Sequence, residues 1–172
     1  RILFFGGGGL GFERSLPYLQ ALQENSNIEI KFVSGKNEVI HQAAKVLATS
    51  NTEVMGYRND IDKLLNWADV VVSKAGGITT TECINSNVPI IAILSFGGQE
   101  KSNVEYLINN NVGKWCSNGK SLARTIDYLC NNKEEIEVMR KNCKKIAKYD
   151  TTLNLINLID SKLKVSSNYI RK

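Results

Sequence analysis

The sequence predicts a doubly wound α/β domain, in which helices cover both faces of a parallel sheet. The first observation is a series of short runs rich in Val and Ile, at residues 2–5, 28–33, 70–72 and 89–94, with a weaker run at 52–55. Such runs, bounded by turn residues, are typical of buried parallel strands. The second observation is that stretches with helical spacing separate them at roughly 20 to 30 residues per unit, which requires right-handed crossovers. A glycine-rich segment directly after the first run makes the pattern Rossmann-like.

The helices expected between these runs lie at residues 13–23, 38–48, 61–67, 79–85 and 99–108. After Val112 the pattern becomes mainly helical, with helices expected at 122–130, 133–148 and 151–165, the last with Asp150 as its N-cap. We find no internal repeat, low-complexity segment or linker, so we expect one domain over residues 1–172. A strand-like run begins directly after Arg1, and we therefore expect the chain to be a piece of a longer protein.

Composition indicates a soluble globular chain, with 42% hydrophobic and 23% charged residues. No apolar run approaches the ~20 residues that a membrane span requires. The 22 basic and 17 acidic residues give a net charge of +5, which suits phosphates, anionic lipid headgroups or nucleic acid without choosing among them. The expected helix at 133–148 has a basic face that is either solvated or in contact with an anionic membrane surface. This face carries Arg140, Lys141, Lys144, Lys145 and Lys148.

The cysteines and the single histidine predict no metal site. The cysteines are Cys83, Cys116, Cys130 and Cys143, and they form no CxxC pair. We expect free thiols in a reducing cytoplasm. His41 falls inside an expected helix, and we expect it to be structural.

Three loops that follow predicted strands carry candidate ligand groups, because such folds bind ligands outside the carboxyl ends of their strands. The first loop contains Gly6, Gly8 and Gly11 in a GxGxxG pattern, which lets a phosphate approach the backbone at a helix start. A dinucleotide site also needs an acidic residue at the end of the second strand, where this chain has Ser34 and Gly35. A NAD-binding module and a purely structural turn are therefore kept as alternatives.

The second loop reads SKAGGITTTE from Ser73 to Glu82. Gly76 and Gly77 lead into an expected helix, whose free N–H groups, dipole and threonine hydroxyls attract a pyrophosphate without a metal. Glu82 falls about one turn into this helix, where its carboxylate can accept hydrogen bonds from both ribose hydroxyls of a nucleotide. The alternative is an ordinary turn in which Glu82 complements the helix dipole.

The third loop reads SFGGQEKSN from Ser95 to Asn103. Its amide and carboxylate side chains, Gln99 and Glu100, offer the donors and acceptors that hexose hydroxyls need. In isolation, an exposed Gln-Glu pair is also explained as solvated surface.

Taken together, the motifs resemble the C-terminal half of the GT-B glycosyltransferases that include monogalactosyldiacylglycerol synthases, processive diacylglycerol glucosyltransferases and the peptidoglycan-precursor GlcNAc transferase. The strongest stretch is 68–115, where KAGGITTTE, NVPII, GGQEKSNVEYL and NNNVGKW follow in the family's order. SGKN at 34–37 and GYRNDIDKLLNWAD at 56–69 fit the same pattern. Several ordered motifs make this resemblance more specific than any one of them.

The resemblance implies that the chain binds a UDP-sugar donor. The implied contacts are Ser34, Tyr57 and Arg58 at the uracil end, Glu82 at the ribose, Gly8, Gly9, Gly77, Ile78 and Thr79 at the phosphates, and Gln99, Glu100 and Asn103 at the sugar. For Tyr57 and Arg58 the implied contact is through the backbone.

The resemblance also implies transfer of a hexose or N-acetylhexosamine to a lipid-type acceptor, with no cofactor, no metal and no catalytic residue in this chain. The acceptor site and the base would lie in a missing N-terminal domain or a partner subunit. Retaining GT-B enzymes carry a second glutamate eight positions before the one that matches Glu82, and Lys74 stands there, which favours inversion. A separate, non-catalytic nucleotide-sugar-binding subunit and a UDP-GlcNAc epimerase fold are alternatives. We expect a cytoplasmic protein, peripheral at the inner face of the membrane, without a nucleic-acid partner.

Overall fold

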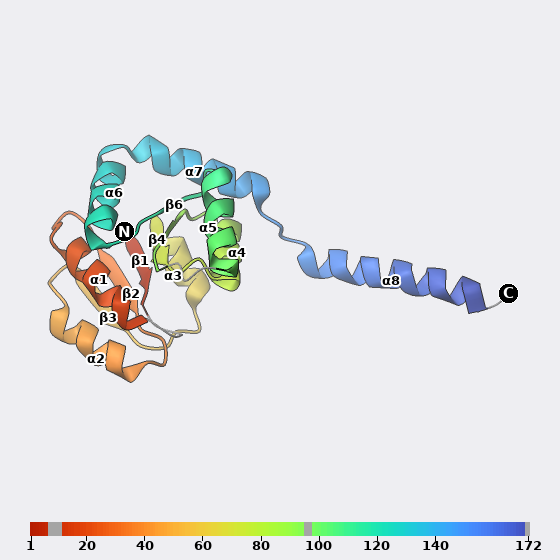
Figure 1. Cartoon of the computed structure of the whole chain (residues 1–172), viewed down its shortest axis with the longest axis horizontal. Coiled ribbons are helices and arrows are strands. Elements are labelled where there is room, and N and C mark those ends of the chain that lie inside the picture. Colours follow the sequence, from red (N-terminus) through yellow and green to blue (C-terminus); the bar gives the residue numbers. More distant parts are fainter. Residues whose placement is uncertain (7–11, 95–97, 171–172) are drawn as a thin grey trace.

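The described part of the structure, a computed structural model, is built on a parallel sheet. It describes the backbone of residues 1–6, 12–94 and 98–170. The strands are β1 (Ile2–Phe5), β2 (Ile30–Val33), β3 (Thr52–Met55), β4 (Val70–Ser73), β5 (Ile90–Ala92) and β6 (Gly113–Trp115). Their order is β3-β2-β1-β4-β5-β6, and every described pair is parallel (Figure 1). The prediction of a doubly wound Rossmann-like sheet is confirmed.

Helices connect the strands and continue beyond the sheet. A 3-10 turn, η1 (Phe12–Ser15), leads into α1 (Leu16–Gln23), and the other helices follow as α2 (Glu38–Leu47), α3 (Ile61–Trp67), α4 (Gly77–Asn85), α5 (Gln99–Asn109), α6 (Gly119–Asn131), α7 (Lys133–Ile146) and α8 (Thr151–Ile170). Every expected helix is present. Their bounds shift by a few residues, and α4 begins two residues before the expected start at Thr79, whereas α6 begins three residues before the expected start at Leu122.

The chain is mainly helical after Val112, as expected, but the short strand β6 was not predicted. This strand has three residues, GKW, and pairs with β5 at the edge of the sheet. Its sequence has no apolar run that would indicate a strand, and Trp115 is exposed. A Cβ at Gly113 would lie 2.2 Å from the carbonyl oxygen of Ile90, so the close approach of the two strands requires glycine.

Helices on both faces of the sheet bury separate apolar clusters. In β1, Ile2 and Phe4 face one cluster and Leu3 faces the other, as the alternation of strand side chains requires. The first cluster includes buried residues of α1, α2 and α6, and the second includes those of α3, α4 and α5. Helix α7 serves both, because Met139 joins the first cluster and Cys143 the second. The rigid sheet therefore fixes where every connecting loop emerges.

Helix α8 extends away from this body as an arm (Figure 1). It is longer than the expected 151–165, and several of its large apolar side chains are exposed: Leu153, Leu155, Ile156, Leu158, Ile159 and Leu163. Within the described residues, the helices are each too short or too polar to cross a membrane.

Candidate functional site

The order of the strands creates a switch point between β1 and β4. The chain winds outward from β1 to β2 and β3 on one side, and from β4 to β5 and β6 on the other. Folds with such a switch point bind ligands outside the carboxyl ends of the strands that flank it. All three loops singled out in the sequence emerge at this edge. Residues 7–11 and 95–97 lie outside the described residues, so the contacts proposed for Gly8 and Gly9 stay predictions.

Gly6, the first residue of the glycine loop, has a packing reason to be glycine. A Cβ at this position would lie 1.9 Å from the ring of Phe32 on the neighbouring strand β2. The buried hydroxyl of Ser15 donates to the Gly6 carbonyl at 3.3 Å, which ties the start of α1 back to the end of β1. The structural alternative is therefore sufficient to explain why residue 6 is glycine, and no ligand is needed to explain it.

The amino end of α4 is open. Gly76 is its N-cap, and no described side chain caps the helix. The N–H of Thr80 bonds to the Gly76 carbonyl at 2.9 Å, whereas the N–H groups of Gly77, Ile78 and Thr79 precede the first intrahelical bonds. No described atom lies within 4 Å of a Cβ built at Gly76 or Gly77, and Ile78 is 79% exposed. These unpaired donors and the helix dipole make this end suitable for an anion.

The side chains of the first turns of α4 divide into inward and outward sets. The Thr81 hydroxyl donates to the Gly77 carbonyl at 2.9 Å, and the buried Thr80 hydroxyl has no hydrogen-bond partner among the described residues. Thr79 is half-buried in the same turn. Glu82 is exposed and lies one turn beyond Ile78 and Thr79 on the same face of the helix. Its carboxylate is accessible to a ligand held at the helix end.

The amino end of α5 lies beside the β4–α4 loop. Gly98 caps it with a φ of +57°, a left-handed conformation that favours glycine, and no described side chain caps this helix either. Gln99 is exposed, whereas Glu100 forms an ion pair with Lys74 at 2.7 Å. The Asn103 amide donates to the Ala75 carbonyl at 2.7 Å. The structure thus joins the predicted sugar residues to the loop that leads into the predicted phosphate residues.

Sequence reasoning did not include Lys74 among the site residues. It was noted only as the residue that replaces a glutamate of retaining enzymes. The available signal was a lysine placed directly between a buried strand and a glycine pair. Its partner could not be predicted, since Lys74 lies in the β4–α4 loop and Glu100 lies in α5, farther along the chain.

Ser34 directly follows β2 and is completely buried. Its hydroxyl donates to the Met55 carbonyl at 3.0 Å and lies 3.0 Å from Nδ1 of His41. These bonds join β2, β3 and α2, which agrees with the structural role expected for His41. The uracil contact proposed for Ser34 stays a prediction. The Ser34 hydroxyl already bonds to the residue that ends β3, so a ligand would share it with that bond.

Tyr57 and Arg58 follow β3 and are exposed. The Lys36 ammonium lies 4.9 Å from the centre of the Tyr57 ring, so the loops after β2 and β3 contact one another. The Arg58 guanidinium binds both oxygens of Asp60, at 2.8 and 2.6 Å. This side-chain hydrogen bond lowers the pKa of Asp60, although burial opposes the shift. The Arg58 side chain is thus held by Asp60, and the backbone contact with uracil stays a prediction.

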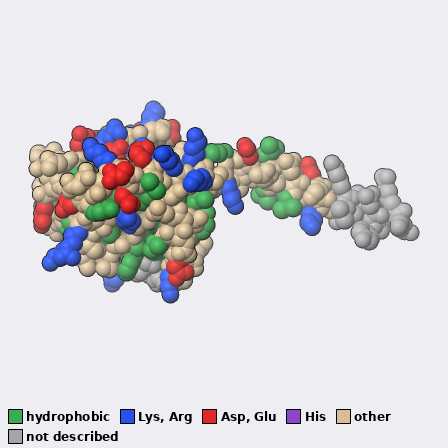
Figure 2. All heavy atoms as spheres, turned by 90° about the horizontal axis from the view of Figure 1, so that it is seen from above, with side chains coloured by type: hydrophobic (Ala, Val, Ile, Leu, Met, Phe, Trp, Pro, Cys, Tyr) green, Lys and Arg blue, Asp and Glu red, His purple; other side chains and the backbone are tan. Residues whose placement is uncertain are grey.

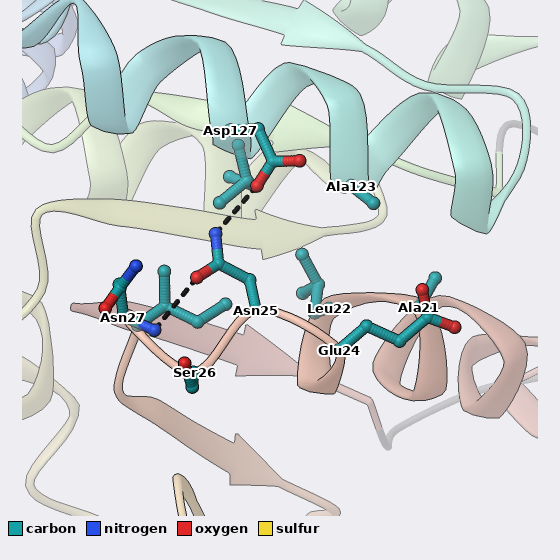
Figure 3. Close-up of a pocket in the computed structure, with 10 residues that line it drawn as sticks. Ala21, Leu22, Glu24, Asn25, Ser26, Asn27, Ala123 and Asp127 are labelled. Atoms are coloured by element: carbon teal, nitrogen blue, oxygen red, sulfur yellow. Dashed lines mark hydrogen bonds between the residues drawn. The ribbon is translucent and has the colours of Figure 1, made fainter.

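The larger cavities of the described structure lie at the opposite edge of the sheet. One, of about 480 Å³, lies between the α1–β2 turn and α6 (Figure 3). Its polar groups are paired, because the Asn25 amide donates to Asp127 at 2.7 Å and accepts from the N–H of Asn27 at 2.9 Å. The loops singled out in the sequence do not line this cavity, so it does not bear on the candidate site.

The thiols and acidic groups of the described residues form no cluster of metal ligands. Across residues 1–6, 12–94 and 98–170, no three His, Cys, Asp or Glu side chains gather in a way that could hold a metal ion. The four cysteines are unpaired, and Cys83, Cys116 and Cys143 are buried. Burial raises the pKa of the Cys143 thiol to about 11, which keeps it protonated and unreactive near neutral pH.

The glycosyltransferase family 28 C-terminal domain matches residues 1–153 of the chain. The chain belongs to this family. Among curated relatives, this family 28 domain is 25% identical to the processive diacylglycerol β-glucosyltransferase of Bacillus pumilus, with 98% of this chain and 45% of the relative covered. It is 30% identical to monogalactosyldiacylglycerol synthase 3 of Arabidopsis thaliana, over 72% of this chain and 27% of the relative. The chain thus spans less than half the length of these relatives.

Solved structures share the fold of the family 28 domain. MurG of Acinetobacter baumannii aligns with a TM-score of 0.77 at 20% identity, covering 93% of this chain and 52% of that one. HepE of Anabaena, solved in complex with UDP-glucose, aligns with a TM-score of 0.70 at 18% identity, covering 96% of this chain and 48% of that one. The match to MurG agrees with the predicted GT-B half, and helix α8 lies almost entirely beyond the residues that the family covers.

Proposed function

We propose that this domain binds the UDP part of a UDP-sugar and serves as the donor half of a lipid glycosyltransferase. The observation that carries the proposal is the amino end of α4 beside the switch point, where no described side chain caps the helix and no described atom lies within 4 Å of a Cβ built at Gly76 or Gly77. Family membership supports the reaction class. The lipid-type acceptor is supported by the diacylglycerol enzymes to which the chain is similar, and the donor class by the complex of HepE with UDP-glucose.

The phosphates would bind the N–H groups of Gly77, Ile78 and Thr79, where a helix supplies roughly half a positive charge. Glu82, exposed one turn farther along, would accept hydrogen bonds from the ribose hydroxyls. Gln99, Glu100 and Asn103 would contact the donor sugar. For the uracil end, we retain the backbone of Tyr57 and Arg58 together with the loop after Ser34.

The proposed reaction is a direct displacement that inverts the anomeric carbon. An acceptor hydroxyl attacks this carbon, and the bond to the terminal phosphate oxygen of UDP breaks with its electron pair. The amino end of α4 would stabilise the charge that develops on the leaving diphosphate, in place of a metal ion. The hydroxyl proton would pass to a base in the acceptor domain or a partner subunit. Inversion is supported by Lys74, which stands where retaining relatives carry a glutamate.

The acceptor would be reached at an anionic membrane surface on the cytoplasmic side. Figure 2 shows basic side chains where the body meets α8, and Lys141, Lys144, Lys145 and Lys148 are exposed there. Arg140 is different, because its guanidinium binds Asp69 at 3.1 Å on the body of the domain. Binding to vesicles that contain anionic lipid, weakened by added salt, would support this contact, whereas equal binding to neutral vesicles would contradict it.

A calorimetric titration of the chain tests the proposed donor site. The ligands are UDP, UMP, NAD, UDP-glucose, UDP-galactose and UDP-N-acetylglucosamine. We expect UDP to bind well above UMP, because the second phosphate contacts the end of α4, and we expect NAD to be inert. The ranking of the three hexoses would indicate the donor. Binding of NAD without UDP would replace the proposal with a dinucleotide site, and a chain that binds none of these ligands would contradict it.

A further inference from the structure

Lys74 and Glu100 form a close and largely buried ion pair at the candidate site. The Lys74 ammonium lies 2.7 Å from Oε1 of Glu100, and the two side chains are only 19% and 23% exposed. The nearby pair of Lys101 with Glu105 provides a contrast, with a distance of 3.9 Å and exposed fractions of 73% and 61%. Water screens the second pair much more than the first, so the Lys74 pair holds its partners in one geometry more strongly.

A second bond acts at the same junction. The Asn103 amide donates to the Ala75 carbonyl at 2.7 Å. Lys74 and Ala75 are consecutive in the β4–α4 loop, and Glu100 and Asn103 lie three residues apart on one face of α5. The two bonds therefore fasten the first turn of α5 to the loop that ends at Gly76, the N-cap of α4.

The ion pair has two consequences for a ligand at this edge. First, a carboxylate has about four acceptor positions, so Glu100 can bind Lys74 and a sugar hydroxyl together. Its bond to the ammonium then fixes the direction in which the carboxylate meets that hydroxyl. Second, the lysine charge balances a carboxylate that would otherwise repel a nearby diphosphate.

We infer that Lys74 is a positioning residue for the donor sugar, acting through Glu100 and joining the sugar-binding turn of α5 to the phosphate-binding end of α4. The inference rests on the proposed function. Lys74 would thus contribute mainly to the extra affinity of a UDP-hexose over UDP. Its contribution to the binding of UDP itself would be smaller.

The test compares two dissociation constants for each variant of the chain, one for UDP and one for the UDP-hexose that binds best. The measured quantity is the ratio of the hexose constant to the UDP constant. We expect K74M to raise this ratio by about tenfold while changing the UDP constant by less than about threefold, because a carboxylate that has lost its orientation loses one charge-assisted hydrogen bond. The conservative variant K74R keeps the charge and should restore most of the wild-type ratio. K101M removes the neighbouring exposed pair and should leave the ratio unchanged.

A double-mutant cycle separates positioning from general stability. In the E100Q background, K74M should change the ratio by less than about twofold, because the group through which Lys74 acts is already altered. The double variant also leaves no unpaired carboxylate, so it provides a folded reference if K74M alone unfolds. An equal effect of K74M in both backgrounds, or an unchanged ratio in K74M, would overturn the inference and leave the UDP site intact. A wild-type chain without affinity for UDP would instead contradict the proposed function, and the inference with it.

Discussion

The helices that begin at the carboxyl edge of the sheet differ in how their amino ends are capped. The amino end of helix α6 has a capping box. The Asn118 side chain accepts from the N–H of Ser121 at 2.8 Å, and the Ser121 hydroxyl accepts in return from the N–H of Asn118. Helix α2 is similar, with Asn37 accepting from the N–H of Ile40 at 3.1 Å. In contrast, α4 and α5 have Gly76 and Gly98 as N-caps, and neither helix is capped by a side chain of the described residues.

The capped helices follow β2 and β6, whereas α4 follows β4 at the switch point and α5 follows β5. Position alone does not decide capping, because α3, which follows the edge strand β3, also has no side-chain cap among the described residues. A side-chain cap satisfies one of the orphan N–H groups of a helix and stabilises the protein by about 1 kcal/mol. A helix without a cap forgoes this stabilisation but keeps its donors available to an anion. The uncapped amino end of α4, beside the switch point, therefore keeps donors that the proposed phosphate site would use.

The largest expected effect on UDP affinity comes from adding a side-chain cap to the amino end of α4. Gly76→Asp would add an N-cap carboxylate to α4, at a φ of −70° with no described atom within 4 Å of the new Cβ. We expect folding stability to stay the same or rise by a few tenths of a kcal/mol. The affinity for UDP should fall by roughly 3 kcal/mol, because like charges about 4 Å apart repel at that scale near a protein surface. Calorimetry with UDP and urea unfolding measure the two quantities.

The neutral variant Gly76→Asn is the matched control for this experiment. It adds a cap of similar size without a charge, so its loss of UDP affinity should be far smaller. If Gly76→Asp bound UDP as well as the wild type, the amino end of α4 would be excluded as the phosphate site.

Removing a side chain of the open helix should have a somewhat smaller effect. Glu82→Ala is expected to weaken UDP binding by roughly 1 to 3 kcal/mol, the scale of lost charge-assisted hydrogen bonds. Thermal unfolding should change little, because Glu82 is exposed. Glu105→Ala, on an exposed position of α5, serves as the control in the same titration. Unchanged UDP affinity in Glu82→Ala would remove this residue from the ribose site.

Removing the side-chain cap of α6 should lower the folding stability without changing the UDP affinity. Asn118→Ala removes the capping box of α6 and is expected to cost about 1 kcal/mol of unfolding free energy, as urea titration would measure. The UDP affinity of the folded variant should stay within about twofold of the wild type. A large loss of affinity would show that α6 also takes part in the site, and the contrast between the two helix ends would fail.

The smallest expected effect is that of metal removal. Since the proposed site neutralises the diphosphate with helix N–H groups, chelation of divalent ions by EDTA should leave the UDP affinity unchanged. Titration with and without EDTA provides the measurement. If EDTA abolished binding and Mg²⁺ restored it, a metal would be performing the role assigned to α4.

The sequence predicted elements whose signal is local. The buried strands β1 and β4 consist of apolar runs, and Gly76 and Gly77 mark the start of α4 to within two residues. The strand β6 was missed because GKW carries no periodic or apolar signal, and only its pairing with β5 makes it a strand. The sequence also predicted that Glu82 and Gln99 lie near helix starts, and both side chains are exposed. The ligand that they would bind cannot be read from such a local pattern.

Thus the sequence by itself determined the family, the succession of the helices and of the strands β1 to β5 along the chain, and the loops in which ligand groups occur. It could do so because hydrophobic runs and turn residues act over a few neighbouring positions. Only the tertiary structure decided the partners of the polar side chains. Asn103 bonds to Ala75 at a separation of 28 residues, and Arg140 meets Asp69 at a separation of 71. The same holds for Lys74 with Glu100. The physical reason is that hydrogen bonds and ion pairs depend on distances of about 3 Å. Such distances exist only after the sheet has brought distant loops to one edge.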